Sequence, residues 1–112
     1  SLHSDAPPRV FKLDLMPDNL RWGEDGALWV TGASGTPDAY FSCWATKGCK
    51  NDYRIVRIDP ASLEHRVVLH PDTAPEFGDA TTALQIGDGV WLAAHPSDRI
   101  GHLRLRTEAP AR

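Results

Sequence analysis

Three features are scarce in this sequence of 112 residues: helical periodicity, long apolar runs and basic charge. No stretch keeps apolar residues at helical spacing over three turns, which disfavours a helical fold. No apolar run approaches the roughly 18 residues that a membrane-spanning helix needs, so we expect no membrane partner. The net charge is −3 and the arginines are scattered, whereas nucleic-acid-binding proteins usually carry a basic face, so we expect no nucleic-acid partner.

Common catalytic motifs are also missing. The sequence has no Gly-rich phosphate loop, no HExxH, no GxSxG and no EF-hand spacing. It contains two cysteines, Cys43 and Cys49, with no CxxC pair and no histidine at zinc-ligand spacing. Two alternatives stay open for these cysteines, a small disulfide loop or two reduced thiols. A disulfide would indicate a secreted or periplasmic protein, and without one the compartment is unknown.

What the sequence does contain is a series of short β-strand patterns separated by turn residues. Strands are predicted over residues 10–15, 19–22, 27–30, 53–58, 65–69, 81–86, 90–93 and 100–105. Asp25-Gly26 and Asp88-Gly89 each stand between apolar segments, which is a strong local pattern for a β-hairpin. The sequence therefore predicts consecutive antiparallel hairpins.

These strands form two imperfect repeats, in which Trp29 and Trp91 occupy corresponding positions 62 residues apart. Four short strands per unit with a hairpin and a buried Trp are typical of a β-propeller blade, although a small β-sandwich has the same strand pattern. The runs 28–30 and 90–93 lack a polar alternate, which predicts burial of both strand faces. Burial of both faces favours the propeller, because a two-sheet sandwich leaves one face of each sheet in water.

We therefore predict an all-β fold of antiparallel four-stranded blades, about two blades of a β-propeller in an incomplete ring. Residues 10–15 would be the outer strand of a preceding blade, 18–69 a blade with an insertion at 34–52, and 81–105 the last blade. Repeat units need about three or more copies for stability. We expect either a companion chain that carries the remaining blades or several copies of this chain that close one ring.

The segment Pro17-Asp18-Asn19-Leu20-Arg21-Trp22, followed by 25–30, resembles a blade of the six-bladed propeller hydrolases. These are the paraoxonase (arylesterase), gluconolactonase and strictosidine-synthase-like proteins, and the likeness covers most of residues 8–105, matching their C-terminal two blades. The resemblance implies a calcium-dependent hydrolase of small esters or lactones, with Asp18 and Asn19 as calcium ligands. Carboxylate and amide oxygens suit calcium, which takes 6 to 8 oxygens, so other blades would supply the remaining ligands. The alternative for Pro-Asp-Asn is a turn.

Blade geometry predicts which loops share one end of the fold. Asp18-Asn19 should lie with the loops 34–52, 70–80 and 94–99, and the tight turns at 23–26, 59–62 and 87–89 should lie opposite. The predicted substrate-shaping residues at this mouth are Tyr40, Trp44, Glu76 and Asp79. His95 lies in the same region and is a candidate general base, the alternative being a surface histidine.

Two main hypotheses for the function follow. The chain is part of a calcium-dependent propeller esterase or lactonase, or it is a non-catalytic binding or assembly module in which several copies close a ring. A condensing activity of the strictosidine-synthase kind is a third possibility. Propellers host many unrelated functions, so the fold by itself does not choose between these hypotheses.

Overall fold

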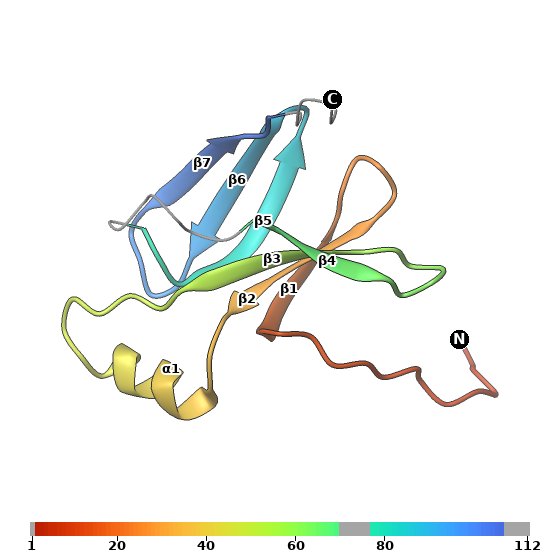
Figure 1. The fold of residues 1–112 in the computed structure, drawn as a ribbon, viewed down its shortest axis with the longest axis horizontal. Coiled ribbons are helices and arrows are strands. Elements are labelled where there is room, and N and C mark those ends of the chain that lie inside the picture. Colours follow the sequence, from red (N-terminus) through yellow and green to blue (C-terminus); the bar gives the residue numbers. More distant parts are fainter. Residues whose placement is uncertain (1, 70–76, 107–112) are drawn as a thin grey trace, which may run out of the picture.

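The computed structural model describes residues 2–69 and 77–106 (Figure 1). Its elements are β1 (Met16–Trp22), β2 (Leu28–Ala33), α1 (Pro37–Trp44), β3 (Tyr53–Ile58), β4 (His65–Leu69), β5 (Ala80–Ile86), β6 (Gly89–Ala94) and β7 (Ile100–Arg104). The first sheet has the order β1-β2-β3-β4, the second sheet has the order β5-β6-β7, and all pairings are antiparallel. The prediction of an antiparallel, largely β structure is confirmed, and the two sheets do not close on each other.

Both Asp-Gly hairpins form as predicted, between β1 and β2 and between β5 and β6. Asp25 accepts a hydrogen bond from the Ala27 N–H at 3.1 Å, and Gly26 takes a left-handed φ of +79°, which costs a glycine nothing. The Asp25 carboxylate also pairs with Arg57 of β3 at 2.8 Å. Asp88 of the second hairpin pairs with Arg104 of β7 at 3.5 Å, so the same contact recurs in both sheets.

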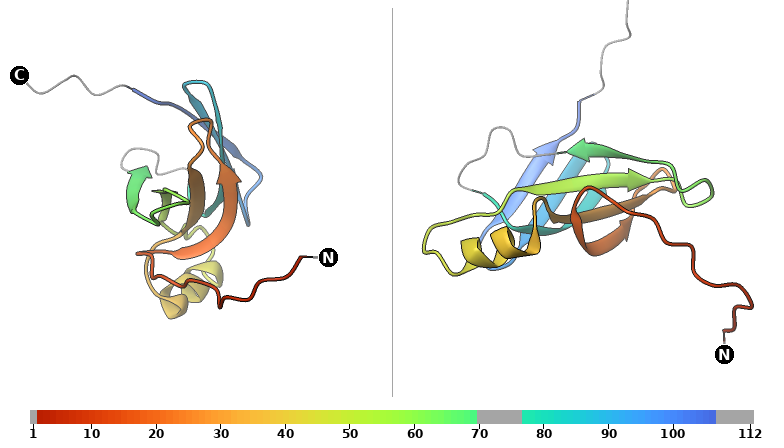
Figure 2. Two further views of the ribbon diagram at one scale, coloured as in Figure 1. Left: turned by 90° about the vertical axis from the view of Figure 1, so that its right-hand side faces the viewer. Right: turned by 60° about the horizontal axis from the view of Figure 1, so that its bottom comes forward.

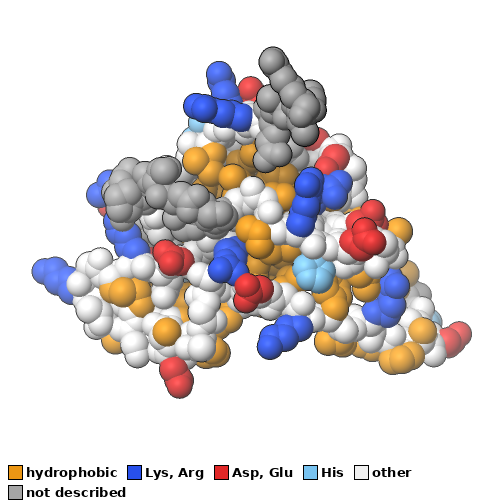
Figure 3. Space-filling model, viewed as in Figure 1, with side chains coloured by type: hydrophobic (Ala, Val, Ile, Leu, Met, Phe, Trp, Pro, Cys, Tyr) orange, Lys and Arg blue, Asp and Glu red, His pale blue; other side chains and the backbone are white. Residues whose placement is uncertain are grey.

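The two sheets share one hydrophobic core, with side chains from β2, β3, β5 and β6. Its buried members are Trp29, Tyr53, Ile55, Ala80, Ala83, Val90 and Leu92. In the same view as Figure 1, hydrophobic side chains also surface between the two sheets, with charged side chains around them (Figure 3). The core is therefore an interface between two sheets that each form locally, as expected for stacked repeats.

Strands β1 and β5, the first strands of the two sheets, lie side by side (Figure 2). Hydrogen bonds between them and their turns run from Asn19 Nδ2 to the Thr81 carbonyl, from Arg21 Nε to Thr82 Oγ1, from the Glu24 N–H to Gln85 Oε1, and from the Gly87 N–H to Glu24 Oε1. Each joins residues 61 to 63 positions apart, which matches the offset of the repeats. Corresponding positions of the two units thus contact each other.

The segment 10–15 forms no strand in the described residues, and its role as the outer strand of a preceding blade stays a prediction. Its alternating leucines instead lie over the face of the first sheet that points away from the second sheet. Leu13 and Leu15 pack there on a cluster that includes Val30 and Val56, and Asp14 pairs with Arg54. In the described chain, the leucines of this segment cover a sheet face.

The insertion 34–52 contains a helix, which the sequence analysis did not predict. Thr36 caps α1 by accepting a hydrogen bond from the Ala39 N–H at 3.2 Å, and Pro37 occupies its first turn. The helix has eight residues, none of them buried, so it has no long apolar periodicity. No helix of the described residues has the length and apolar character to cross a membrane.

The prediction that both faces of residues 90–93 are buried presupposes further units, and in the described residues one of the two faces is exposed. Trp29 is 5% exposed in the first sheet, whereas Trp91 is 46% exposed in the second. Val90 and Leu92 point into the shared core, and Trp91 between them points to the opposite face, because side chains alternate along a strand. In the described part of the chain, nothing covers that opposite face.

Candidate functional site

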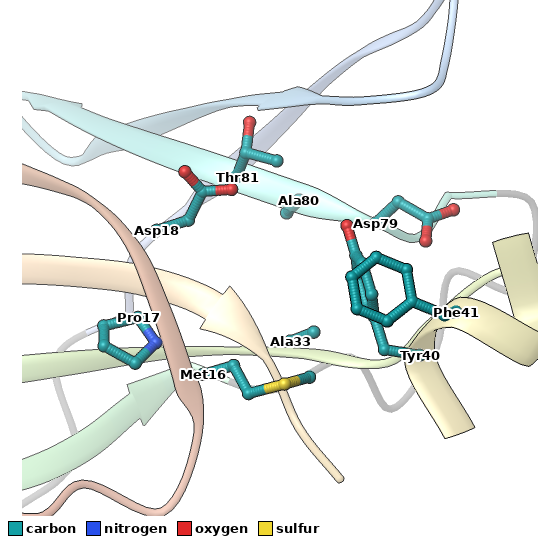
Figure 4. Close-up of a pocket in the computed structure, with 9 residues that line it drawn as sticks. All are labelled: Met16, Pro17, Asp18, Ala33, Tyr40, Phe41, Asp79, Ala80 and Thr81. Carbon is teal, nitrogen blue, oxygen red and sulfur yellow. The ribbon is translucent and has the colours of Figure 1, made fainter. Parts of the chain in front are cut away.

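The loops at one end of the two sheets converge on a cavity of about 180 Å³ (Figure 4). Its lining comes from β1, β2, α1 and the start of β5: Met16, Pro17, Asp18, Ala33, Tyr40, Phe41, Asp79, Ala80 and Thr81. Three of the predicted site residues, Asp18, Tyr40 and Asp79, therefore lie around one cavity. The hydrogen bond between Glu24 and Gly87 holds two tight turns together at the other end of β1 and β5, as blade geometry predicts.

Asp18 and Asn19 lie within β1, so the alternative of a turn at Pro-Asp-Asn is wrong. The pairing of β1 with β2 shifts register between Pro17 and Asn19, which marks a β-bulge, and bulges often redirect side chains next to sites. The Asn19 Nδ2 donates to Asp18 Oδ1 at 3.1 Å and to the Thr81 carbonyl at 2.9 Å. This orientation leaves the Asn19 carbonyl oxygen available as an acceptor.

Tyr40 reaches from α1 toward β5, and in Figure 4 its hydroxyl group lies between the carboxylates of Asp18 and Asp79. Burial raises the pKa of the Tyr40 phenol, and the negative charges of Asp79 and then Asp18 raise that pKa further. The phenol therefore stays protonated at neutral pH and can donate a hydrogen bond into the cavity. The cavity pairs this donor with two acidic side chains.

Asp79 joins three loops of the mouth. It is 7% exposed and has a left-handed φ of +58°. Its Oδ1 accepts from the Asn51 N–H at 3.0 Å, its own N–H donates to the Asn51 carbonyl at 2.9 Å, and its carbonyl accepts from the His95 N–H at 3.2 Å. Besides lining the cavity, Asp79 thus holds the insertion and the loop after β6 against the start of β5.

Asn51 is a buried member of this network that the sequence analysis missed. Its Nδ2 donates to the Tyr40 carbonyl at 3.3 Å, while its main chain pairs with Asp79. An asparagine in a polar loop is ordinary, so nothing in the sequence distinguishes Asn51 from its neighbours. Phe41, also missed, lies on the same short helix as Tyr40 and would have been found with that helix.

The predicted residues Trp44 and His95 form a separate aromatic contact and do not line the cavity. Their rings lie 5.5 Å apart in an edge-to-face arrangement, and Trp44 also lies 5.8 Å from Tyr40. His95 is exposed, and its ring contacts Trp44 and not the residues that line the cavity. The hypothesis that His95 acts as a general base stays a prediction, and Glu76 lies outside the described residues.

Cys43 and Cys49 form a disulfide, so of the two alternatives the structure has the bonded one. Cys43 lies near the end of α1, and Cys49 lies in the loop that leads to Asn51. The bond therefore ties the helix that carries Tyr40 to the loop that contacts Asp79.

The cavity has the donor types that a calcium ion prefers, but in a small number. Asp18 and Asp79 line it with carboxylate oxygens, and Asn19, next to Asp18 in β1, carries an amide oxygen. Among the described residues, no group of three or more His, Cys, Asp or Glu side chains is arranged to hold a metal ion. Any calcium ion at this mouth would need ligands from outside the described part of the chain.

No protein-family model matches this chain, and comparisons with curated proteins and with solved structures likewise gave no match.

Proposed function

We propose that this chain supplies two blades of a β-propeller hydrolase, and that the cavity at Asp18, Tyr40 and Asp79 belongs to its substrate mouth. The substrates would be small esters or lactones, and the cofactor would be calcium. The observation that carries the proposal is the convergence of loops from both sheets on one cavity with two carboxylates and a protonated phenol. The resemblance of residues 17–30 to propeller hydrolases supplies the reaction class.

The sheet arrangement supports the propeller part of this proposal. Each sheet is an antiparallel meander, the two sheets pack face to face, and their first strands lie side by side. Contacts between corresponding positions, such as Asn19 with Thr81, are what a rotational repeat produces. In a sandwich the two sheets have no such equivalence.

Asp18 and Asn19 are the proposed calcium ligands of this chain. The Asn19 amide is held by Thr81, and the free carbonyl oxygen of that amide is the ligand atom. A bound calcium ion would polarise the substrate carbonyl and stabilise the oxyanion that forms on hydrolysis. Tyr40 would orient the substrate by donating a hydrogen bond, and the apolar lining from Met16 and Phe41 would hold its hydrocarbon part.

Calcium titration of the chain with its natural partners tests the metal hypothesis. Asp18→Ala should weaken calcium binding at least tenfold and leave the thermal unfolding temperature within about 2 °C, because Asp18 is exposed. Asp98→Ala is the matched control, since Asp98 is exposed and lies outside the cavity. Equal calcium affinity in the wild type and Asp18→Ala would show that Asp18 is no ligand.

Hydrolysis of a panel of aryl esters and lactones tests the reaction class. Tyr40→Phe removes only the hydroxyl group and should raise KM with a smaller effect on kcat, because the proposed role of that hydroxyl group is orientation. Absence of hydrolysis by the assembled protein, with calcium present, would contradict the enzyme hypothesis.

The second candidate function is a non-catalytic assembly module. It is favoured by the small number of metal-binding side chains in the described residues and by the exposed apolar face around Trp91. A protein that assembles but neither binds calcium nor hydrolyses any ester would support this candidate over the first.

A further inference from the structure

We infer that a second copy of this chain docks head to tail on the exposed face of the second sheet, and that it does so with the outer face of its own first sheet. The inference rests on the internal interface between the two sheets and on the repeat equivalence of their residues. It needs neither the calcium site nor hydrolysis, so its failure is distinguishable from failure of the proposed function.

The internal interface shows how one unit receives the next. One face of the first sheet, with Trp29, Tyr53 and Ile55, packs against the inner face of the second sheet, with Val90 and Leu92. We call the face of each sheet that carries its tryptophan, Trp29 in the first sheet and Trp91 in the second, the receiving face. The opposite face, with Val30 in the first sheet and Val90 in the second, is the inserting face. The chain therefore contains one complete example of an inserting face packed on a receiving face.

In the described residues, no other sheet packs on the receiving face of the second sheet. Trp91 is the repeat equivalent of Trp29, yet it is 46% exposed where Trp29 is 5% exposed. Leu84 pairs with Trp91 across the strands, and Ala93 pairs with Ile100, so Leu84 and Ile100 extend the same exposed apolar face. These side chains line a hollow of about 290 Å³.

The inserting face of the first sheet is the other half of such an interface. Val30, which corresponds to Leu92 at the repeat offset of 62, is buried on this face, while Trp22 at its edge is 65% exposed and Leu20 and Val67 are exposed as well. The second sheet buries its own inserting face against the first sheet, and the inserting face of the first sheet is likewise apolar but has an exposed rim. Large exposed apolar patches of this kind mark interaction sites.

The segment before β1 does not prevent the inserting face of the first sheet from docking on another copy. The equivalent segment before β5 lies inside the internal interface between the two sheets. Leu15 packs over Val30 just before β1, and Phe77, which is 62 residues further along the sequence, precedes β5. Phe77 contacts Tyr53 of the first sheet, with ring centroids 6.0 Å apart, and packs on the shared core. A side chain at this position is thus sandwiched between two units, and Leu15 occupies the corresponding place.

An interface between two different faces of the same chain is heterologous, so association does not stop at a symmetric pair. Successive copies would add in one rotational sense and close a ring when the rotation between units permits. A dimer through two Trp91 faces would be isologous, and the internal interface offers no example of a receiving face packed on a receiving face.

Sedimentation velocity and native mass spectrometry over a range of concentrations test this inference. The wild type should associate, and Trp91→Lys and Trp22→Lys should each weaken association at least tenfold, because each places a charge among the exposed apolar side chains of one face. Phe41→Lys is the matched control, since Phe41 is 61% exposed but lies on α1, away from both faces. Circular dichroism and thermal unfolding verify that every variant is folded.

Mixing the two variants separates the head-to-tail arrangement from the alternatives. Each variant keeps one competent face, so Trp91→Lys and Trp22→Lys together should form a one-to-one pair that does not grow. A wild type that stays monomeric at every concentration would overturn the inference. So would a Trp22→Lys chain that associates as strongly as the wild type, because that result would indicate an isologous contact through Trp91.

Discussion

The two sheets of this protein begin from nearly the same sequence pattern and end in different environments. In the first sheet, β2 is covered on one face by the second sheet and on the other by Leu13 and Leu15. In the second sheet, β6 is covered on one face, and Trp91 on the other face is exposed. The comparison teaches that burial of a strand depends on how many neighbours its sheet has, even when the strand patterns are similar.

The loops differ between the two units as well. The first unit carries the insertion with α1, the disulfide and Asn51, while the second unit turns from β6 to β7 over residues 95–99. The insertion packs on the start of the second unit through Asp79. The insertion of the first unit therefore contributes contacts between the two units.

Truncation of the two equivalent tryptophans should show the largest difference between the sheets. Trp29→Ala should lower the free energy of unfolding by about 3 to 5 kcal/mol, because Trp29 is buried in the shared core. Trp91→Ala should lower it by less than about 1 kcal/mol in the monomer, since Trp91 is half exposed. Urea unfolding at concentrations where the chain is monomeric measures both, and equal losses would contradict the assignment of the two faces.

Removal of the disulfide tests the insertion that only the first unit carries. Reduction, or replacement of Cys43 and Cys49 by serine, should lower the stability of the insertion by about 2 kcal/mol. This is the size expected when a disulfide that closes a short loop is lost. Because α1 has no buried residue, the loss should be local. Hydrogen exchange should then show α1 losing protection while β2 and β6 keep theirs; equal loss in the sheets would show that the insertion supports the whole fold.

Asp79→Ala tests the joint between the two units. The Asn51 N–H would lose its carboxylate acceptor in a buried place, and the alanine would have to keep a φ of +58°, so stability should fall by about 1 to 2 kcal/mol. Asp79→Asn is the control, because asparagine tolerates this φ and keeps an acceptor oxygen. Thermal unfolding compares the two, and an Asp79→Ala chain as stable as the wild type would remove the structural role of Asp79.

The hairpin ion pairs should give the smallest effect. Hydrogen bonding to Arg57 and to the Ala27 N–H lowers the pKa of Asp25 below its ordinary value. The stabilisation from Asp25 is therefore present above the ordinary carboxyl pKa and is lost as pH falls through the lowered pKa of the folded state. Both groups are partly exposed, so it should stay below about 1 kcal/mol. NMR titration of Asp25 in the wild type and in Arg57→Gln measures the shift, which should largely disappear in the variant.

Much of the strand order was predictable from local patterns. The two Asp-Gly hairpins and the alternation in 53–58 and 81–86 depend on neighbours in sequence, and the structure has strands at these places. The helix α1 was missed because two turns without a buried face carry little periodicity, although Thr36 and Pro37 form a good helix start. The alternation in 10–15 predicts a strand, but alternation does not distinguish pairing with a neighbouring strand from covering a sheet face, which is what Leu13 and Leu15 do here.

The candidate site was predictable only in part. The order of strands and loops was enough to predict that Asp18, Tyr40 and Asp79 lie at one end, and the three side chains line one cavity. It did not find Asn51, whose role depends on hydrogen bonds to residues 11 and 28 positions away. It also grouped His95 and Trp44 with the cavity residues, although these two rings contact each other beside the cavity.

The sequence by itself determined the hairpins, their turns and the repeat, because these follow from the turn residues and the side-chain alternation of adjacent segments. Tertiary structure decided which faces are buried and which side chains meet at the mouth. The reason is physical: burial and long-range hydrogen bonds depend on which sheet packs against which, and the similar motifs around Trp29 and Trp91 do not encode which sheet will cover each of them.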